Sequence, residues 1–442
     1  MPGPSSTPDV VVIGGGPAGS VAASLLAARG HRVLVLERER FPRYHIGESL
    51  LSATLPILDA IGVTPAIERH GFLETPGGTF RWGRQAEPWS FRFAEDPGGR
   101  PHAYQVVRAE FDQLLLDNAR AHGAEVEEEC SVTRVALDGH GPVVHARRAA
   151  GGERTLTPAF VIDASGQQAL VGRANGLRRL NPFFRNLAVF GYFRDAERLP
   201  PPITNNILSC AFEEGWFWFI PLHDGTTSVG AVVDVERFRT VAADDPESTY
   251  AGLIARCPEI AARTRPATRV GPVRVIRDYS YDSTRFHGRG WLLAGDAACF
   301  IDPIFSTGVH LASLSGFLGA RAIHHILGGS VPEDEALAEY ERGYRGAFER
   351  YLRFLTYFYD HNTDPDSYFW TARRLLTHSP EDLDTRQSFV RLMSGGGDWD
   401  ALPDVVEREH ARFAAAIRAE RVAALPGADA FRVRTTERLL EQ

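Results

Sequence analysis

Lysine is absent from this sequence. All 48 residues counted as lysine or arginine are arginine, so no chemistry that needs an ε-amine can take place on this chain. The 56 acidic residues leave a formal net charge of −8, and no run of arginines stands out. Because a phosphate backbone is bound through a basic patch, we expect no nucleic-acid partner.

Cysteine and long apolar runs are also scarce. The chain has four cysteines, which lie far apart and form no CxxC pair: Cys130, Cys210, Cys257 and Cys299. This spacing predicts neither a disulfide framework nor a metal site, and it fits a reducing cytoplasm. The first apolar run, Val10 to Ile13, is short, and no run approaches the roughly 18 residues of a membrane span. We therefore expect a cytoplasmic protein without a membrane-spanning segment.

The first motif present is a βαβ unit from Asp9 to Glu37. A β-branched run leads into a glycine turn, a helical run of alanine and leucine, and a second β-branched run. Gly14, Gly16 and Gly19 form GxGxxG, in which the turn, the approach of a pyrophosphate and helix–strand packing each exclude a side chain. Glu37 follows Gly14 by 23 residues, where a carboxylate can accept a hydrogen bond from a ribose hydroxyl. The unit predicts a dinucleotide site.

A second motif far along the chain decides which dinucleotide. Gly295 and Asp296 follow a short strand, WLLA, and precede a loop and a long helix that we expect to start near Val309. The carboxylate can bind a polyol, and the positive end of the helix dipole can face electron-rich ring atoms. A second cofactor contact of this kind indicates FAD rather than NAD.

The remaining elements predict a second sheet and a helical tail. Strands are expected in the aromatic segment 80–93 and again in 187–235, with an amphipathic helix over 106–121 between them. From Pro332 the pattern is helical, and an aromatic stripe from Tyr344 to Phe358 is expected to be core.

Several longer motifs resemble those of the flavin-dependent halogenases, particularly the enzymes that act on phenolic or pyrrolic substrates. They are GGGPAG with Glu37, PRYHIGESLL at 42–51, DASG at 163–166, GWFWFIP at 215–221 and GDAACFIDPIFSTGVHLA from Gly295. The likeness runs from about residue 8 to about residue 400.

The resemblance implies the aromatic-hydroxylase fold. This is an α/β architecture with a Rossmann-like, doubly wound FAD-binding domain, an inserted mixed or antiparallel sheet that covers the substrate, and a helical C-terminal tail. The implied division assigns 8–60, 96–175 and 270–330 to the FAD domain, 61–95 and 176–269 to the substrate sheet, and 331–442 to the tail.

The family's cofactor contacts can be carried over to matching positions. The resemblance implies that Gly14, Gly16, Gly19 and Glu37 hold the ADP half of FAD, and that Gly295 and Asp296 hold the ribityl chain and pyrophosphate. By the same likeness Arg43, Glu48 and Arg108 are further cofactor contacts. The two arginines could instead be surface ion-pair residues.

The resemblance also implies where the reaction occurs. Thr307 and Gly308 would lie beside the isoalloxazine at the halide site, while Trp216 and Trp218 would wall off the flavin. The implied reactants are reduced FAD, O2 and, for a halogenase, chloride. We expect a separate flavin reductase, because there is no second GxGxxG and DASG departs from hydroxylases that accept hydride directly. The implied substrate is a small aromatic molecule, which a carrier protein could hold.

One departure from the family alters the expected chemistry. Halogenases of this kind pass hypohalous acid to a lysine, and the matching position in this chain is Thr75. A threonine hydroxyl forms no haloamine, and the guanidinium groups of the neighbouring Arg81 and Arg84 stay protonated and are poor nucleophiles. The usual relay is therefore disfavoured.

The first interpretation is accordingly an FAD-dependent monooxygenase of halogenase descent. A flavin C4a-hydroperoxide would give its distal oxygen directly to an electron-rich substrate carbon, in a pocket whose walls protect it from water. We expect an aromatic wall made by Trp82, Trp89, Phe217 and Trp218.

Three alternatives remain open at this point. The chain could be a halogenase whose relay role falls to Arg81, to Arg84 or to a substrate amine; it could be a non-catalytic flavoprotein; or it could be a reductase of isoprenoid double bonds. Candidates for a catalytic base are His102, His310 and Glu48.

Overall fold

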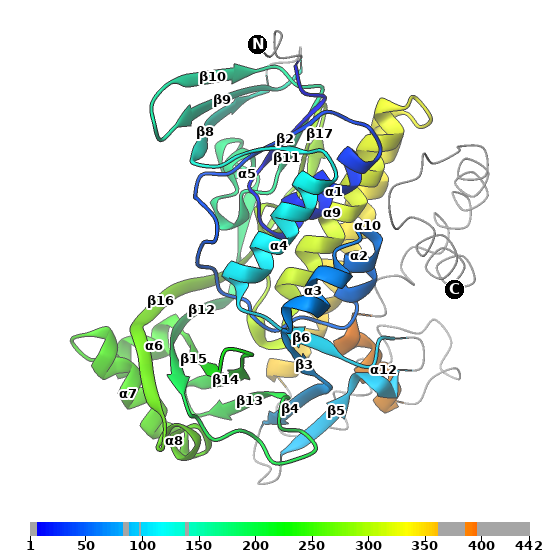
Figure 1. The fold of residues 1–442 in the computed structure, drawn as a ribbon. Coiled ribbons are helices and arrows are strands. Elements are labelled where there is room, and N and C mark those ends of the chain that lie inside the picture. The colour runs from blue at the N-terminus through cyan, green and yellow to red at the C-terminus, as the bar shows by residue number, and fades with distance from the viewer. Residues whose placement is uncertain (1–6, 83–87, 97–98, 138–140, 361–384, 396–442) are drawn as a thin grey trace.

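The structure is a computed structural model of the chain. It describes residues 7–82, 88–96, 99–137, 141–360 and 385–395. The segments 361–384 and 396–442, for which we expected helices, lie outside the described residues. The predicted α/β class is confirmed by two large sheets with helices packed on them (Figure 1).

The first large sheet has six strands in the order β17-β18-β11-β1-β2-β7. Its strands are β1 (Val10–Ile13), β2 (Val33–Leu36), β7 (Glu125–Glu127), β11 (Phe160–Asp163), β17 (His287–Gly288) and β18 (Trp291–Leu293). All neighbours pair in parallel except β17 with β18. The strands β1, β2, β11 and β18 are buried along their whole length, as expected for parallel strands covered on both faces.

Three helices pack together on this sheet. They are α1 (Pro17–Ala28), α4 (Arg108–Ala121) and α9 (Thr307–Leu327), and α9 in turn contacts α10 (Glu333–Asp360). The helix expected near Val309 thus begins two residues earlier, so Thr307 and Gly308 belong to its first turn. A three-stranded sheet of β8 (Cys130–Ala136), β9 (Val143–Arg148) and β10 (Glu153–Leu156) lies on the far side from α10 (Figure 1).

The second large sheet has seven strands in the order β16-β12-β15-β14-β13-β4-β5. They are β4 (Gly77–Arg81), β5 (Trp89–Arg92), β12 (Arg178–Arg194), β13 (Ile207–Phe212), β14 (Gly215–Pro221), β15 (Thr226–Asp234) and β16 (Thr268–Ser283). All pairs are antiparallel except β13 with β4. The predicted domain division stays a prediction, and we note that this sheet continues past residue 269 through β16.

Short elements connect and cover the two sheets. The strands β3 (Leu73–Thr75) and β6 (Ala103–Gln105) pair, and the connecting helices are α2 (Thr54–Ala60), α3 (Thr64–His70) and α5 (Leu170–Ala174). One face of the seven-stranded sheet is covered by α6 (Val235–Val241), α7 (Pro246–Arg256) and α8 (Pro258–Thr264). The other face looks towards the six-stranded sheet and α10.

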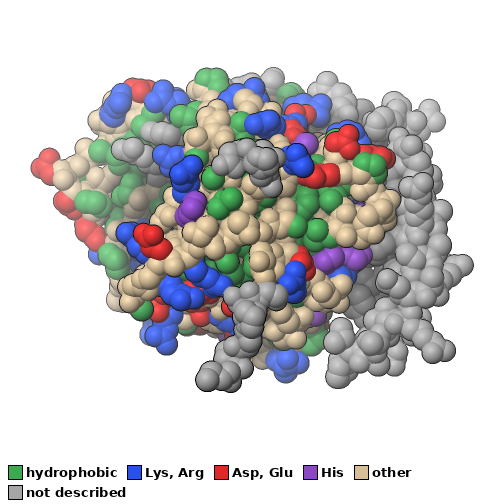
Figure 2. Space-filling model, turned by 90° about the horizontal axis from the view of Figure 1, so that it is seen from above, with side chains coloured by type: hydrophobic (Ala, Val, Ile, Leu, Met, Phe, Trp, Pro, Cys, Tyr) green, Lys and Arg blue, Asp and Glu red, His purple; other side chains and the backbone are tan. Residues whose placement is uncertain are grey.

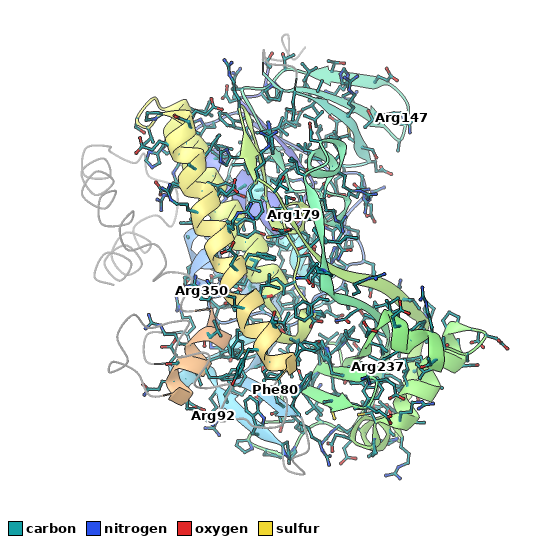
Figure 3. The ribbon with its side chains drawn as sticks, turned by 180° about the vertical axis from the view of Figure 1, so that it is seen from behind. Phe80, Arg92, Arg147, Arg179, Arg237 and Arg350 are labelled. Atoms are coloured by element: carbon teal, nitrogen blue, oxygen red, sulfur yellow. The ribbon has the colours of Figure 1, made fainter. Side chains whose placement is uncertain are left out.

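Aromatic packing joins α10 to the seven-stranded sheet. The stripe from Tyr344 to Phe358 is buried, which confirms that it is core. Phe80 of β4 lies near the C-terminal end of α10 (Figure 3), where its ring centroid is 5.7 Å from that of Phe358. Phe389 of α12 (Thr385–Ser394) packs against Phe80 itself and against Phe354 of α10, so β4, α10 and α12 meet in one aromatic cluster.

The surface shows no field of one sign on the face seen in Figure 2, where arginine and acidic side chains are interspersed. Among the described residues, no helix has both the length and the apolar composition needed to cross a membrane.

Candidate active site

The glycine turn after β1 is shaped by contacts that leave no room for side chains. Gly14 has a φ of +100°, and a Cβ there would lie 2.5 Å from the carbonyl oxygen of Ala164. At Gly19 a Cβ would lie 2.0 Å from the carbonyl oxygen of Gly14, because α1 packs directly on the turn. A Cβ on Gly16 would meet Arg43 Nη2 at 3.4 Å. Gly14 and Gly19 thus allow close packing of the backbone, while Gly16 leaves space for an anion beside Arg43.

Glu37 closes this turn from the end of β2. Its carboxylate is buried and accepts hydrogen bonds from the backbone N–H of Gly15 and of Glu39, both at 2.8 Å. The carboxylate is thereby held beside the glycine turn, where the sequence places the ribose. Its contact with a ribose stays a prediction.

Arg43 and Arg108 meet on one buried carboxylate, that of Asp112. Asp112 accepts from Nε and Nη2 of Arg108 at 2.8 and 2.9 Å, and from Nη1 of Arg43 at 2.9 Å. Burial alone would raise the pKa of Asp112, but the two guanidinium groups outweigh it and hold the pKa below its usual range. The expected alternative of surface ion pairs does not fit, because the side chains of Arg43 and Arg108 are only 10% and 5% exposed. Two cations share one anion, which leaves positive charge for a ligand.

Arg108 also positions the segment that carries Glu48. Its Nη1 donates to the carbonyl oxygens of Ile46 at 2.6 Å and Gly47 at 3.3 Å. The PRYHIGE segment is therefore fastened to the first turn of α4, which no sequence pattern indicated.

The second motif lies where α1 and α9 approach each other. Gly295 has a φ of +59°, and a Cβ there would lie 3.2 Å from that of Ala18 and 3.3 Å from that of Ala312. Burial raises the pKa of the neighbouring Asp296 to about 6, although Arg108 favours its charged form. The structure thus brings Asp296 into the electrostatic range of Arg108, from the other end of the chain.

Glu48 begins a chain of hydroxyl groups that reaches the surface. Tyr192 donates to Glu48 Oε1 at 2.7 Å, and the hydroxyls of Tyr192 and Tyr44 are 3.0 Å apart. Burial raises the pKa of the Glu48 carboxyl to about 7, although Ser228 and Tyr192 favour its ionised form. Its Oε2 is buried and has no hydrogen-bond partner within the described part of the chain. Tyr44, at the other end, is 41% exposed. Neither tyrosine was a candidate from sequence.

The GWFWFIP segment is β14, and its alternation separates the tryptophans from Phe217. Trp216 and Trp218 belong to the main core, whereas Phe217 packs in the separate core under α7 and α8. Trp218 Nε1 donates to Ser228 at 3.0 Å, and the rings of Trp216 and Trp82 are 6.3 Å apart. The expected aromatic wall is therefore wrong for Phe217, since neighbouring strand residues point to opposite faces.

Trp89, another residue expected in the aromatic wall, packs against the core. Its ring stacks on Phe80 with centroids 4.7 Å apart. Two of the four expected wall residues, Trp82 and Trp218, thus share a face with Trp216.

Asp302 is a buried carboxylate close in sequence to the cavity residues Ile304 to Ser306, and sequence reasoning did not single it out. It is buried, and its carboxylate accepts from Asn186 at 2.8 Å and from the Tyr359 hydroxyl at 3.0 Å. Tyr359 in turn accepts from Trp216 Nε1 at 2.6 Å. Burial raises the pKa of Asp302 to about 6. Its position within the FIDPIFSTG motif was a signal that could have found it.

The N-terminus of α9 is open. Ser306 has a left-handed backbone, with φ 55°, and no described side chain caps the helix. Thr307 is buried, whereas a Cβ on Gly308 would meet no described atom within 4 Å. The first N–H groups of a helix lack internal partners and carry partial positive charge, so this end can receive an anion.

A small cavity joins Thr75 to the start of α9. Its polar lining includes Ser49, Thr75, Ser209 and Ser306, and the rest of its wall is formed by Leu50, Leu51, Gly77, Gly78, Phe80, Phe91, Phe93, Ile207, Ile304, Phe305 and Met393. Thr75 is 1% exposed, and its hydroxyl donates to the carbonyl oxygen of Gly77 at 2.9 Å. Thr75, the position expected for the relay, therefore lines the same cavity as Ser306, the residue before Thr307.

The other candidates lie elsewhere. Arg81 forms an ion pair with Glu259 and does not line the cavity, and Arg84 lies outside the described residues. His102 packs on Tyr104 with ring centroids 5.2 Å apart, and His310 is buried within α9. Burial raises the pKa of the Glu48 carboxyl to about 7, which suits the exchange of a proton near neutral pH.

Two cysteines that are distant in sequence meet in the core. Cys210 and Cys257, 47 positions apart in sequence, have their sulfur atoms 3.5 Å apart. Both thiols are free and buried. The two thiols meet because β13 and the start of α8 come together in the core under the sheet.

Comparisons with known proteins decide the family. The tryptophan halogenase family profile matches residues 9–101 and 96–416. The chain is 37% identical over 404 residues to a tryptophan 2-halogenase of Chondromyces crocatus, covering 89% of this chain and 76% of that protein. It is 35% identical over 369 residues to the flavin-dependent halogenase armH1 of Armillaria mellea, covering 78% and 70%.

Solved structures agree. The myxobacterial chondrochloren halogenase CndH superposes with a TM-score of 0.78 at 45% identity, covering 91% of this chain and 93% of that one. The flavin-dependent halogenase CmlS gives 0.78 at 36% identity, covering 91% and 78%.

The chain belongs to the tryptophan halogenase family. It is therefore an enzyme of the flavin-dependent oxidoreductase type, and the cofactor of this family is FAD. Two observations fit that cofactor: the space at Gly16 beside Arg43, and the Asp296 carboxyl, whose charged form Arg108 favours. The comparisons favour halogenation over the monooxygenase interpretation that we placed first.

We expect Asp296→Asn to weaken flavin binding in this halogenase family member. A hydrogen bond to a charged group contributes about 1.5–3 kcal/mol, so the Kd for FAD should rise by about 10- to 150-fold. Fluorescence titration of the apoprotein measures this change. Asp282→Asn, which alters a carboxylate paired with Arg179 at the protein surface, is the control. Equal FAD affinity in all three proteins would contradict the assignment of Asp296.

Proposed function

We propose that the protein is a flavin-dependent halogenase that halogenates a small, electron-rich aromatic molecule. The observation that carries this proposal is the open N-terminus of α9, which adjoins the cavity that contains Thr75. The family relationship supports the same conclusion. When bound and reduced, FAD supplies the activation of O2 that turns halide into an electrophile.

The residues of the chain would then bind the cofactor and the halide and would keep solvent out of the site. Arg43 and Arg108 offer their shared positive charge to the cofactor's phosphates, and Asp296 would accept hydrogen bonds from its polyol chain. The N–H groups at Thr307 and Gly308 would hold the halide, because the helix end is positive and uncapped. Trp216 and Trp218 would separate this site from solvent.

The passage of the halogen has to differ from a lysine relay. No lysine exists, and Arg81 is occupied by Glu259. We propose that hypohalous acid moves along the hydroxyl groups of Ser306, Thr75 and Ser209, which line the cavity. Without a bound haloamine to direct it, the reaction suits a phenol or pyrrole, which is electron-rich enough to react with hypohalous acid itself. A substrate amine could take the relay role instead.

Glu48 is the proposed proton carrier. Its pKa of about 7 lets it hold or release a proton near neutral pH, and Tyr192 and Tyr44 connect it to solvent. A proton is consumed when hypohalous acid forms, so a buried acid that solvent can recharge fits the proposed reaction.

We expect Glu48→Gln to change how stability depends on pH. The folded pKa is raised above the unfolded value, so the folded state holds a proton that the unfolded state has lost between about pH 4.5 and 7. As pH rises through this window, the free energy of unfolding of the native protein should fall relative to that of the variant, by up to about 1.4 kcal/mol per pH unit. Above about pH 7 the difference between the two proteins should stay constant. Urea denaturation from pH 4.5 to 8 measures the difference. The exposed Glu153→Gln should give a flat difference, and a flat difference for Glu48→Gln would refute the raised pKa.

A monooxygenase is the second candidate function, and the absence of lysine favours it. The same cavity would then bring the substrate carbon directly to the flavin. Product mass spectrometry with a candidate phenol or pyrrole, reduced FAD and O2 separates the two. The halogenase proposal expects a halogenated product whose yield follows added chloride or bromide, whereas a product that forms equally well without halide would refute it.

We propose that a separate reductase supplies the reduced FAD and that the substrate is a free or carrier-bound small molecule. NADPH alone should then leave the bound flavin oxidised, and an added flavin reductase should bleach it. Rapid bleaching by NADPH alone would rule out the need for a partner.

A further inference from the structure

Two histidines and a glutamate converge outside the proposed active site. His70 is the last residue of α3, Glu110 lies in the first turn of α4, and His223 lies in the turn between β14 and β15. Glu110 Oε2 is 2.8 Å from His70 Nε2 and 3.2 Å from His223 Nε2. One ligand atom from each residue lies within 4.8 Å of the other two.

These separations are slightly shorter than the spacing of metal ligands, so the three side chains would have to move apart slightly to hold an ion between them. Zinc binds imidazole nitrogen and carboxylate oxygen at about 2.0–2.2 Å, so tetrahedral ligands lie roughly 3.3–3.6 Å from one another. The side chains of His70, Glu110 and His223 are 30%, 39% and 19% exposed. A metal held by the three would therefore keep a position open to water, with the ligand types that suit zinc and similar divalent metals.

A buried aromatic side chain orients both imidazole rings. Phe72 is 4% exposed, and its ring centroid is 4.3 Å from that of His70 and 5.2 Å from that of His223. The second contact is edge-on, with an interplanar angle of 85°. Fixed ring orientation is what a metal site needs from the residues behind its ligands.

We propose that His70, Glu110 and His223 form a binding site for a divalent transition metal of the zinc type. The site joins α3 and α4 to the β14–β15 turn, so it would brace the first turn of α4, which carries Arg108, against the strand that carries Trp216 and Trp218. Its role is structural, and the proposed reaction does not depend on it. The three ligands lie far apart in the sequence, so neither their spacing nor the cysteine pattern predicted a metal site.

The test uses the full-length FAD-loaded protein, freed of metal by a chelator and then titrated with Zn2+. We expect one equivalent to bind, with a rise in the melting temperature. His223→Ala should lower the zinc affinity by at least about 100-fold, because loss of a supporting residue alone costs 10- to 100-fold. Glu110→Gln separates a metal site from a hydrogen-bonded cluster, since the amide oxygen can still accept from one imidazole but provides no anionic ligand.

The control is His324→Ala, which breaks another close histidine pair, with His31 Nε2 and His324 Nδ1 2.9 Å apart. It should leave zinc binding unchanged. Flavin content, measured on each variant, reports correct folding. Two results would overturn the site: no zinc retained by the native protein, or equal zinc affinity in the native, His223→Ala and Glu110→Gln proteins.

Discussion

Gly19→Ala should abolish flavin uptake. The added Cβ would lie 2.0 Å from the carbonyl oxygen of Gly14 and 3.1 Å from Val12 Cγ1. A backbone oxygen cannot move aside as a flexible side chain can, so α1 must shift away from the glycine turn that is proposed to receive the pyrophosphate. We expect a loss of FAD affinity of more than about 100-fold, since even a 1 Å displacement of binding groups is costly. Flavin absorbance after reconstitution of the apoprotein measures it.

Gly252→Ala is the matched control. Gly252 also lies inside a helix, α7, but a Cβ there would meet no described atom within 4 Å. Alanine is favoured over glycine in a helix by about 1 kcal/mol, so this variant should be as stable as the native protein or more stable, with full flavin uptake. If Gly19→Ala also took up flavin normally, the assignment of the turn to the cofactor would be wrong.

Arg108→Met should destabilise the protein strongly. The side chain of Asp112 is fully buried, and Arg108 supplies two of the three charged hydrogen bonds that it accepts. Removing one partner of a buried ion pair destabilises by about 3–5 kcal/mol, because it leaves charge uncompensated. Since Arg43 remains bound to Asp112, we expect the lower end of this range. Urea denaturation of the apoprotein measures the change without a contribution from flavin.

Arg120→Met on the same helix is the control. Arg120 pairs with Asp117 and Glu128 at the surface, where its side chain is 33% exposed. Such pairs contribute about 0–1 kcal/mol, so this variant should differ little from the native protein. If both variants lost a similar free energy of unfolding, the buried ion pair of Arg108 would contribute no more to stability than a surface ion pair.

The local elements of the cofactor site could be predicted from sequence. The βαβ unit was visible because β-branched strands, helical spacing and three glycines all lie within Asp9 to Glu37. The structure supports the reasons given for the glycines, with Gly14 in a left-handed turn and Gly19 against the backbone. These features depend on neighbours in sequence, which is why pattern alone reveals them.

Contacts between distant segments could not be predicted. The meeting of Glu48 with Tyr192, or of Cys210 with Cys257, depends on how two sheets and their covering helices pack. Phe217 was misplaced for a related reason, because an aromatic-rich strand gives little sign of which residues face which core.

The absence of lysine does not by itself make this chain a monooxygenase. Loss of the lysine expected at Thr75 excludes a haloamine on this chain, but it leaves the remainder of the site unchanged. Homologues that match most of the chain are halogenases. The uncapped α9 and the mainly apolar cavity, with the hydroxyl groups of Ser306, Thr75 and Ser209 in its wall, provide a physical basis for halogenation without that amine.

The most direct test of the proposed halogenase is a single turnover under 18O2 with bromide present, followed by mass spectrometry of the aromatic product. We predict bromine in the product and no 18O, because the labelled oxygen should leave as water after it has carried the halogen. A product that contains 18O and no bromine would contradict the proposal and establish oxygen transfer instead.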